Sequence, residues 1–343
     1  MWRSLRRAGL GVGVLLLMGA TAGATFEVVA ASRDAAAYPP PGRLVDVGSH
    51  QMHIACVGEG SPTVVFESGL ANMSADWANI QPSVGAYTRA CAYDRTGIAW
   101  SNDGPHAREP RQIAQELHTL LTNAGVPGPY VLAGQSFGGL YVRVFADLYP
   151  DEVAGLVFVD ASHPDQWQRV PPEVAAAFVP TPTQALAFRG LAHLGFTRLT
   201  GAYPAQCGLA AAQCAEERAW MMSARKMDAF VAEMGAPQRD AQVRASATLG
   251  ARPLVVLTAS EHSDMVSPAY ASQFDALWRQ LQADLATLST NSTHSIVDGS
   301  THGSLQTQHA AVTSAAVQQV VQSVRTGQPL ATLEGWSPTA ATQ

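Results

Sequence analysis

Charged side chains are scarce in this chain of 343 residues. Only 14% of the residues are charged, against 47% that are hydrophobic, and the net charge is −6. Basic residues gather only within the first seven positions, so no stripe of them could neutralise the phosphates of a nucleic acid. We therefore exclude nucleic acid as a partner. The hydrophobic content is enough to bury a large core, as one domain with an insertion or as two domains.

Cysteines and metal-binding patterns are also few. No C-x-x-C, no H-E-x-x-H and no carboxylate cluster with metal spacing occurs, so we predict no structural or catalytic metal and no cofactor. The four cysteines are an even number, which permits disulfides if the chain is exported. Cys207 and Cys214 lie close together in one loop-rich stretch, which favours a local bridge.

The longest run without charge lies near the N-terminus. Three arginines in the first seven residues precede an apolar stretch over residues 8–26, and the small residues Ala22-Gly23-Ala24 stand near its end. Residues 1–29 are therefore predicted to be a signal peptide or an N-terminal membrane anchor. Either would place the folded part outside the cytoplasm, secreted or anchored. The Ala- and Pro-rich residues 30–43 are interpreted as a linker that holds the domain off the membrane.

Strand and helix patterns alternate along the rest of the chain, after an opening hairpin. This alternation predicts an α/β protein with a mostly parallel sheet and helices on both faces. The predicted strands are 43–47, 52–57, 63–67, 89–93, 130–133, 155–160, 254–258 and 294–297, and the main predicted helices are 77–87, 110–124, 140–149, 271–289 and 311–324.

One segment interrupts this alternation. Residues 164–252 are mainly helical in pattern and rich in aromatic residues and methionine, and we interpret them as a cap inserted over the carboxyl edge of the sheet. Most of these large apolar side chains are expected to form the core of the cap rather than to line a substrate site. The core domain would then comprise residues 44–163 and 253–325, followed by a C-terminal tail over 326–343.

The most specific motif is Gly134-Gln135-Ser136-Phe137-Gly138-Gly139, which stands between a predicted strand and a predicted helix. This is the G-x-S-x-G pattern in a strand-turn-helix setting. A serine on such a tight turn is held in a strained conformation that projects its Oγ from the sheet edge, and a Cβ at Gly134 or Gly138 would collide with the turn. Ser136 is therefore the predicted nucleophile, and the amides at the start of the following helix point toward it.

Four motifs together make the chain resemble the α/β-hydrolase fold enzymes, and specifically their extracytoplasmic serine esterase-like branch. They are Val64-Val65-Phe66-Glu67-Ser68-Gly69-Leu70, Cys91-Ala92-Tyr93-Asp94-Arg95-Thr96-Gly97, the serine motif, and Val159-Asp160-Ala161-Ser162-His163-Pro164. The resemblance covers residues 44–325 and is weakest in the cap. It implies an eight-stranded sheet with the nucleophile after strand five, a cap after strand six and a histidine after strand eight.

The same resemblance bears on the other two cysteines. The fold sets its second strand beside its fourth, so Cys56 and Cys91 would be neighbours and able to form a bridge. The alternative is a pair of buried free thiols.

A serine hydroxyl needs an imidazole to take its proton, and that imidazole must be oriented by a carboxylate. His302, in Asp298-Gly299-Ser300-Thr301-His302-Gly303, follows the last predicted strand and precedes the last predicted helix. This position satisfies the chain order Ser, acid, His, so we predict His302 as the general base. Four other histidines could compete for this role, but each lies in a predicted strand, a predicted helix or the opening hairpin, where a structural role explains it. They are His294, His309, His118 and His53.

Two carboxylates compete for the role of triad acid. Asp160 ends the predicted strand 155–160, and Asp264 follows the predicted strand 254–258. The second location is the commoner one in the family that the chain resembles, but the offset of Asp264 from its strand is unusually long. We favour Asp160, by resemblance to branches whose acid follows strand six, and keep Asp264 as the alternative acid. Outside a triad, Asp160 would brace its loop by accepting hydrogen bonds from nearby amides.

The resemblance places the oxyanion hole at the backbone N–H groups of Leu70 and Phe137. Ser68-Gly69 stands where many relatives carry His-Gly, so the sequence departs from the family's pattern at this hole. Glu67 is expected to end its strand facing solvent, and we assign it no catalytic role.

These residues together imply a serine hydrolase that cleaves small-molecule carboxylic esters through an acyl-enzyme. An aspartate in place of Ser136 would have indicated epoxide hydrolysis or dehalogenation. One alternative is an iminopeptidase- or amidase-type hydrolase, which would need carboxylates of the cap to hold a substrate amine. The candidates for that purpose are Glu173, Glu216, Glu217 and Glu233. A slow-turnover ligand-binding protein of the same fold is the other alternative.

Overall fold

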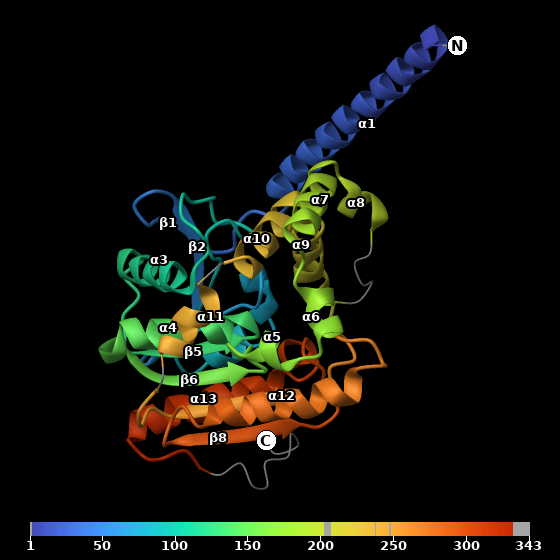
Figure 1. The fold of residues 1–343 in the computed structure, drawn as a ribbon. Helices are drawn as coiled ribbons and strands as arrows, with labels where there is room; N and C mark the ends of the chain where they lie inside the picture. Colours follow the sequence, from blue (N-terminus) through green and yellow to red (C-terminus); the bar gives the residue numbers. More distant parts are fainter. Residues whose placement is uncertain (1, 202–206, 237, 247, 332–343) are drawn as a thin grey trace.

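The computed structural model describes residues 2–201, 207–236, 238–246 and 248–331 (Figure 1). Within them, eight strands form one sheet in the order β1-β2-β4-β3-β5-β6-β7-β8. The first two strands form an antiparallel hairpin, β2 joins β4 antiparallel, and all further pairs are parallel. The predicted mostly parallel, eight-stranded sheet is thus confirmed. The strands are β1 (Arg43–Asp46), β2 (Gln51–Val57), β3 (Thr63–Glu67), β4 (Ala90–Tyr93), β5 (Tyr130–Gln135), β6 (Val153–Val159), β7 (Leu254–Ala259) and β8 (Ser292–Val297).

The helices fall into three groups: one N-terminal helix, those that cover the sheet, and those inserted between β6 and β7. The N-terminal helix is α1 (Trp2–Ala37). The sheet is accompanied by η1 (Ser74–Trp77), α2 (Gln81–Gly85), α3 (Pro110–Asn123), α4 (Phe137–Leu148), η2 (Pro150–Glu152), α12 (Ala271–Ala286), η3 (Ser304–Gln306) and α13 (Ala310–Thr326). The inserted helices are α5 (Gln166–Arg169), α6 (Pro172–Phe178), α7 (Pro182–His193), α8 (Phe196–Thr200), α9 (Ala211–Met221), α10 (Ala224–Met234) and α11 (Arg239–Ala245).

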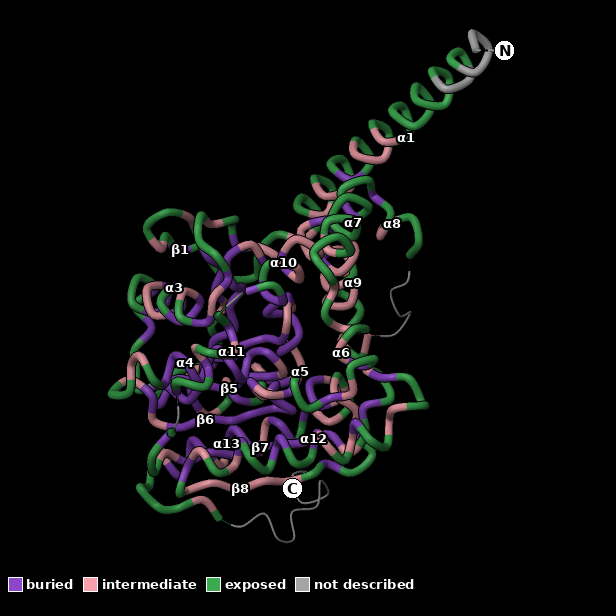
Figure 2. Tube along the Cα trace, in the orientation of Figure 1, coloured by how far each residue is buried: buried purple, intermediate pink, exposed green. Residues whose placement is uncertain are grey.

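Both faces of the sheet are covered because successive side chains along a strand point to opposite sides. In β3, Val65 belongs to the core formed with α3 and α4, whereas Val64 and Phe66 belong to the core formed with α2 and α13. The central strands β3 and β5 are buried along their whole length, as a parallel sheet between two helical layers requires. Figure 2 shows β5 and its neighbour β6 in purple, in contrast to the exposed outer part of α1 in green.

The predicted helix over residues 77–87 is wrong in its extent. The 3-10 helix η1 ends at Trp77, and α2 covers only Gln81–Gly85. Pro82 explains the interruption, because proline lacks an N–H and clashes with the preceding turn, so it is tolerated only in the first turn of a helix.

The predicted linker over residues 30–43 is also corrected, because α1 continues as a helix to Ala37. Proline restricts only the residue directly before it, so Pro39-Pro40-Pro41 leaves the alanine-rich residues upstream free to be helical. The end of α1 also packs on the cap. Arg198 of α8 binds Glu27 and Asp34 of α1 at 2.6 Å each, and the amide of Ala224 donates to Glu27 at 2.9 Å.

The inserted helices stand beside the carboxyl end of β6 (Figure 1). Some of their apolar side chains pack on the core domain: Trp220 and Ala229 join Ala71 and Met73, while Val170 and Val174 join α12. Both cysteine pairs are bridged. The Cys56–Cys91 disulfide links directly opposed residues of β2 and β4, and Cys207–Cys214 closes a short loop of the cap. Most of the predicted tail, residues 332–343, lies outside the described residues.

Candidate active site

Ser136 lies on a tight turn between β5 and α4. Its backbone is in the left-handed half of conformational space, with φ 53° and ψ −124°, which an L-residue adopts only under strain. The glycines on either side leave no room for a side chain: a Cβ on Gly134 would lie 2.6 Å from the backbone of Gly138, and one on Gly138 would meet the Glu67 carbonyl. The serine side chain is thus presented at the carboxyl edge of the sheet.

Asp160, directly after β6, is fully buried and accepts four hydrogen bonds. One oxygen accepts from the Ala259 amide and the Trp278 indole, both at 2.9 Å. The other accepts from His302 Nδ1 at 2.6 Å and from His262 Nε2 at 2.9 Å. Burial alone would raise the pKa of Asp160, but the bonds and charges of the two histidines outweigh it and hold that pKa well below its usual range.

His262 is a member of this cluster that the sequence patterns did not reveal. It is completely buried, and its Nδ1 lies 2.8 Å from Asp275 of α12 while its Nε2 faces Asp160. Burial lowers the pKa of His262, but the two carboxylates outweigh burial, so the pKa is raised above 6.5. The sequence offered one sign of its role: His262 lies two residues before Asp264, in the loop that was considered for the alternative triad acid.

Asp264, the alternative acid, lies elsewhere. It is exposed, and its Oδ2 accepts a hydrogen bond at 3.0 Å from the amide of Gly303. The structure therefore brings Asp160 to the ring of His302 and Asp264 to the backbone beside that histidine.

The second nitrogen of His302 faces the nucleophile turn. Its Nε2 lies 3.0 Å from Nε2 of the side-chain amide of Gln135, the residue before Ser136. With Nδ1–H donating to Asp160, Nε2 carries the lone pair that accepts from this amide. Among the described residues no hydrogen bond joins Ser136 Oγ to the imidazole, and Gln135 takes the place next to it.

The residues expected to form the oxyanion hole lie on two neighbouring segments. Phe137 is the first residue of α4, so its amide has no partner within the helix. Leu70 belongs to the loop after β3, and the carbonyls of Ser68 and Gly69 in that loop accept hydrogen bonds from Arg95 at 2.8 and 2.7 Å. Gly69 also leaves space for Gln135, whose Oε1 a Cβ there would meet at 2.5 Å.

Arg95 is the centre of a buried ion network that contacts this loop. It binds Glu67 at 2.6 Å and Glu233 of the cap at 2.7 Å, while the Tyr93 hydroxyl donates to Glu67. The expectation that Glu67 faces solvent is therefore wrong, since its side chain is only 1% exposed. A carboxylate at this strand end is tolerated because Arg95 lies directly beside it. Burial lowers the pKa of Arg95, but the attraction of Glu233 and Glu67 exceeds this effect and raises it above its ordinary value.

The other histidines occupy the plainer positions expected for them. Each has a local partner: His53 binds Asp94, His118 binds Glu152, His294 contacts Thr258 and His309 contacts Ser304. Asp160, His262 and His302 also present ligand-type atoms within 4.8 Å of one another. Those atoms already engage each other in hydrogen bonds, which suits the holding of protons better than the binding of a cation.

The fold agrees with the sequence comparison. The family described as alpha/beta hydrolase fold matches residues 62–287, and the chain therefore belongs to the α/β-hydrolase fold family. Solved structures with the same fold include haloalkane dehalogenase DbeA from Bradyrhizobium elkani, with a TM-score of 0.63 and 20% identity over 83% of this chain and 99% of that one. A thermophilic esterase from Thermogutta terrifontis gives a TM-score of 0.60 and 19% identity over 82% and 99%.

Curated relatives match shorter stretches. The uncharacterized protein YbdG of Bacillus subtilis is 22% identical over 49% of this chain and 52% of its own length. The putative carbamate hydrolase RutD of Cronobacter sakazakii is 30% identical over 29% of this chain and 38% of its own. The chain spans between a fifth and about half of the length of the first curated relatives that it matches.

Proposed function

We propose that the protein is a serine hydrolase that cleaves carboxylic esters with the triad Ser136, His302 and Asp160. Ser136 Oγ bonds to the ester carbonyl carbon while His302 Nε2 takes its proton. The bond to the leaving oxygen then breaks, and His302 returns the proton to that oxygen. Water repeats the sequence on the acyl-enzyme, and the amides of Leu70 and Phe137 stabilise the oxyanion in both halves.

The observation that supports this proposal best is the 2.6 Å hydrogen bond between His302 Nδ1 and a buried Asp160. It directs the lone pair of Nε2 toward the turn that carries Ser136. In this arrangement the side-chain amide of Gln135 donates a hydrogen bond to that lone pair. Substrate binding would therefore have to displace Gln135 before Nε2 accepts the serine proton, and apo sites often show such incomplete contacts.

The peptidase alternative loses support from the cap carboxylates. Glu233 is 1% exposed and already bound to Arg95, and Glu173 is exposed on the outer surface of α6. Glu216 lines a recess between α9 and α1. Glu217 lines a recess together with Thr301 and Gly303, the neighbours of His302. The dehalogenase relatives share the fold, but serine at position 136 favours acyl transfer over halide displacement.

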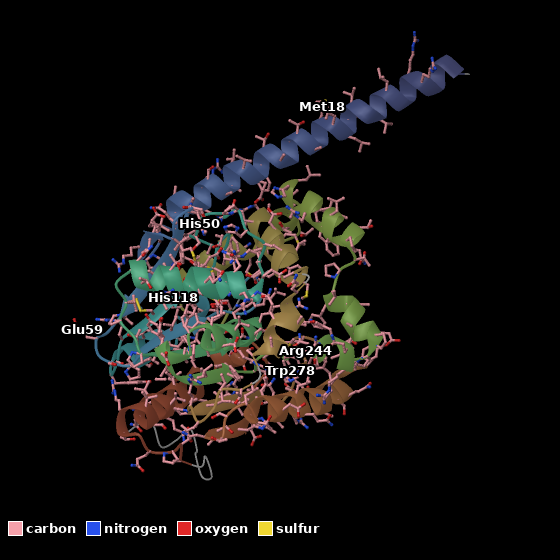
Figure 3. All side chains as sticks on the ribbon, turned by 60° about the vertical axis from the view of Figure 1, so that its left-hand side comes forward. Met18, His50, Glu59, His118, Arg244 and Trp278 are labelled. Carbon is pink, nitrogen blue, oxygen red and sulfur yellow. A yellow bond between two sulfur atoms is a disulfide. The ribbon has the colours of Figure 1, made fainter. Side chains whose placement is uncertain are left out.

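We further propose that the protein acts outside the cytoplasm, attached through α1. Within this helix, Leu10–Ala37 is long and apolar enough to cross a membrane by length and composition, although a signal sequence would show the same pattern. Met18, which is 64% exposed, lies on the part of α1 that projects from the domain (Figure 3). Two disulfides suit an oxidising compartment.

The test is the initial rate of hydrolysis of p-nitrophenyl esters from acetate to palmitate by the wild type and three variants. Ser136→Ala should abolish activity. Asp160→Asn should lower kcat by roughly 10³- to 10⁴-fold, because it lets the imidazole take the wrong tautomer. Asp264→Asn, the matched control, should cost less than about tenfold, because its carboxylate contacts only a backbone amide.

Activity that survives Ser136→Ala would reject the triad. Equal and small losses at both aspartates would reject Asp160 as the acid. Cleavage of aminoacyl anilides without cleavage of esters would favour the amidase function, and labelling of Ser136 by a fluorophosphonate without any turnover would favour the ligand-binding protein.

A further inference from the structure

A second recess adjoins the proposed site on the side of His302, with a volume of about 270 Å³. Asn72 and Asp76, just after the oxyanion loop, form one wall, and Thr301 and Gly303, on either side of His302, form another. The cap helix α9 adds Glu217, and the loop after β7 adds Asp264. Three carboxylates therefore line this space, which we call the acidic recess.

Asp76 is the unusual member of this group. Its side chain is only 8% exposed, and its Oδ2 has no hydrogen-bond partner among the described residues. Buried carboxylate oxygens nearly always accept a hydrogen bond, because leaving one unsatisfied is unfavourable. Asp76 therefore has an oxygen without a donor, and its side chain lines a recess that could admit a ligand carrying one.

The protein's own neighbouring cation does not fill this role. Lys226 of α10 directs its ammonium group to the carbonyl of Ala71 and the side-chain oxygen of Asn72, both at 2.8 Å, and to the carbonyl of Leu70 at 3.4 Å. These contacts use its three donors. Burial and the repulsion from Glu217 raise the pKa of Asp76, in spite of the attraction of Lys226. A further positive charge beside this carboxyl would lower its pKa and favour the ionised form.

We propose that the acidic recess binds a protonated amine carried by the leaving group of the substrate. This inference rests on the proposed ester hydrolysis and adds a substrate class, namely esters of alcohols or phenols that bear an ammonium group. His302 protonates the leaving oxygen, so the leaving group lies on the His302 side, where Thr301 and Gly303 border the recess. A primary ammonium brings the N–H donors that Asp76 lacks, together with charge that suits Glu217 and Asp264.

The test compares 4-(aminomethyl)phenyl acetate with 4-ethylphenyl acetate, which has a similar shape and no charge. The wild type should prefer the cationic ester in kcat/KM by ~10- to 100-fold, the effect of one hydrogen bond between charged groups. Asp76→Asn and Glu217→Gln should each reduce this preference toward unity while the neutral ester is still cleaved. Glu216→Gln, on the same helix but lining the recess toward α1, should leave the preference unchanged.

Binding without turnover separates this inference from the proposed function. Benzylammonium chloride is titrated into the Ser136→Ala variant, with and without Asp76→Asn, by calorimetry. Binding that depends on Asp76 would support the recess even if no ester is cleaved, in which case only the hydrolase proposal fails. A wild type that cleaves both esters equally, or a Ser136→Ala protein that binds no benzylammonium, would overturn the inference.

Discussion

At the scale of single residues, the partners of Asp160 decide what it can do. Its two oxygens accept from an amide, an indole and two imidazoles, so each oxygen has two hydrogen-bond donors. A carboxylate in this setting stays ionised and holds the His302 ring in one orientation. This is what a triad acid is required to do, because it orients the imidazole without taking up the proton itself.

His262 is a neighbour of this pair whose charge can be tested. Because its folded-state pKa is raised, the stabilisation that it provides is complete below its unfolded value of about 6.5 and is lost as pH rises through the folded value. His262→Gln should lower the free energy of unfolding by about 3–5 kcal/mol at a pH of about 5.5, and the difference from the wild type should shrink toward pH ~9. Urea denaturation across this range measures it.

His118→Gln is the matched control, since this histidine makes an ion pair with Glu152 in which the side chains are 31% and 39% exposed. Its cost should stay below about 1 kcal/mol. A difference for His262→Gln that is constant with pH, or that grows in alkali, would show that His262 is neutral in the folded protein.

The residues of the site were predictable to different degrees. Ser136 stands in a motif that local sterics impose, and His302 stands at a fixed place in the chain order. Asp160 and Asp264 each follow a strand, and only the folded chain separates the one that reaches the ring from the one that reaches the backbone. Arg95 and Glu233 meet across 138 positions of sequence, so no local pattern could pair them.

At the scale of elements, the cap holds in place the loop after β3, which we propose to form part of the oxyanion hole. Three of its side chains converge on Ala71, whose φ is +51°. Glu233 accepts from the amide at 2.8 Å, and the carbonyl accepts from Lys226 at 2.8 Å and from Trp220 at 3.0 Å. The strained loop beside Leu70 therefore depends on helices α9 and α10 for its conformation.

Removal of one of these contacts should reduce stability and rate together. Glu233→Ala leaves Arg95 buried with one of its two carboxylate partners, so we expect a loss of about 3–5 kcal/mol of unfolding free energy and a fall in kcat of roughly 10²-fold as the loop shifts. Denaturation and ester kinetics measure the two effects. Asp228→Ala, which removes a partly exposed ion pair on the same helix, should cost less than about 1 kcal/mol. A stable Glu233→Ala protein with full kcat would mean that the cap does not support the loop.

The elements were predicted well where burial sets the pattern. The strands β3 and β7 are short, fully buried hydrophobic runs. Their hydrophobic residues alone locate them to within about two residues. The errors came from proline: Pro82 cut short an expected helix, and the three prolines after Tyr38 suggested a linker where α1 is helical. Tertiary contacts of Glu27 and Asp34, which local composition does not reveal, hold that helix on the cap.

At the scale of the whole molecule, α1 has two halves with different surroundings. Leucines 15, 16 and 17 are about 70% exposed, whereas Glu27 is 5% exposed against the cap. Deletion of residues 2–22 should release the protein from membranes without loss of activity or thermal stability, because the contacts with the cap begin at Gly23. Alkaline extraction of membranes, followed by activity assays of pellet and supernatant, measures this. A truncated chain that still sediments with membranes would contradict it, and so would a full chain that is soluble throughout.

The continuity of α1 also determines where the enzyme can search for substrate. At 1.5 Å per residue the helix is ~54 Å long, and a bilayer core takes only ~20 of its residues. A flexible tether of 14 residues would let the domain wander over ~20 Å, but α1 is clamped to the cap through Arg198. In a bilayer the proposed active site would keep one height and one tilt above the lipid, so that substrates would be selected by their distance from the membrane as well as by their chemistry.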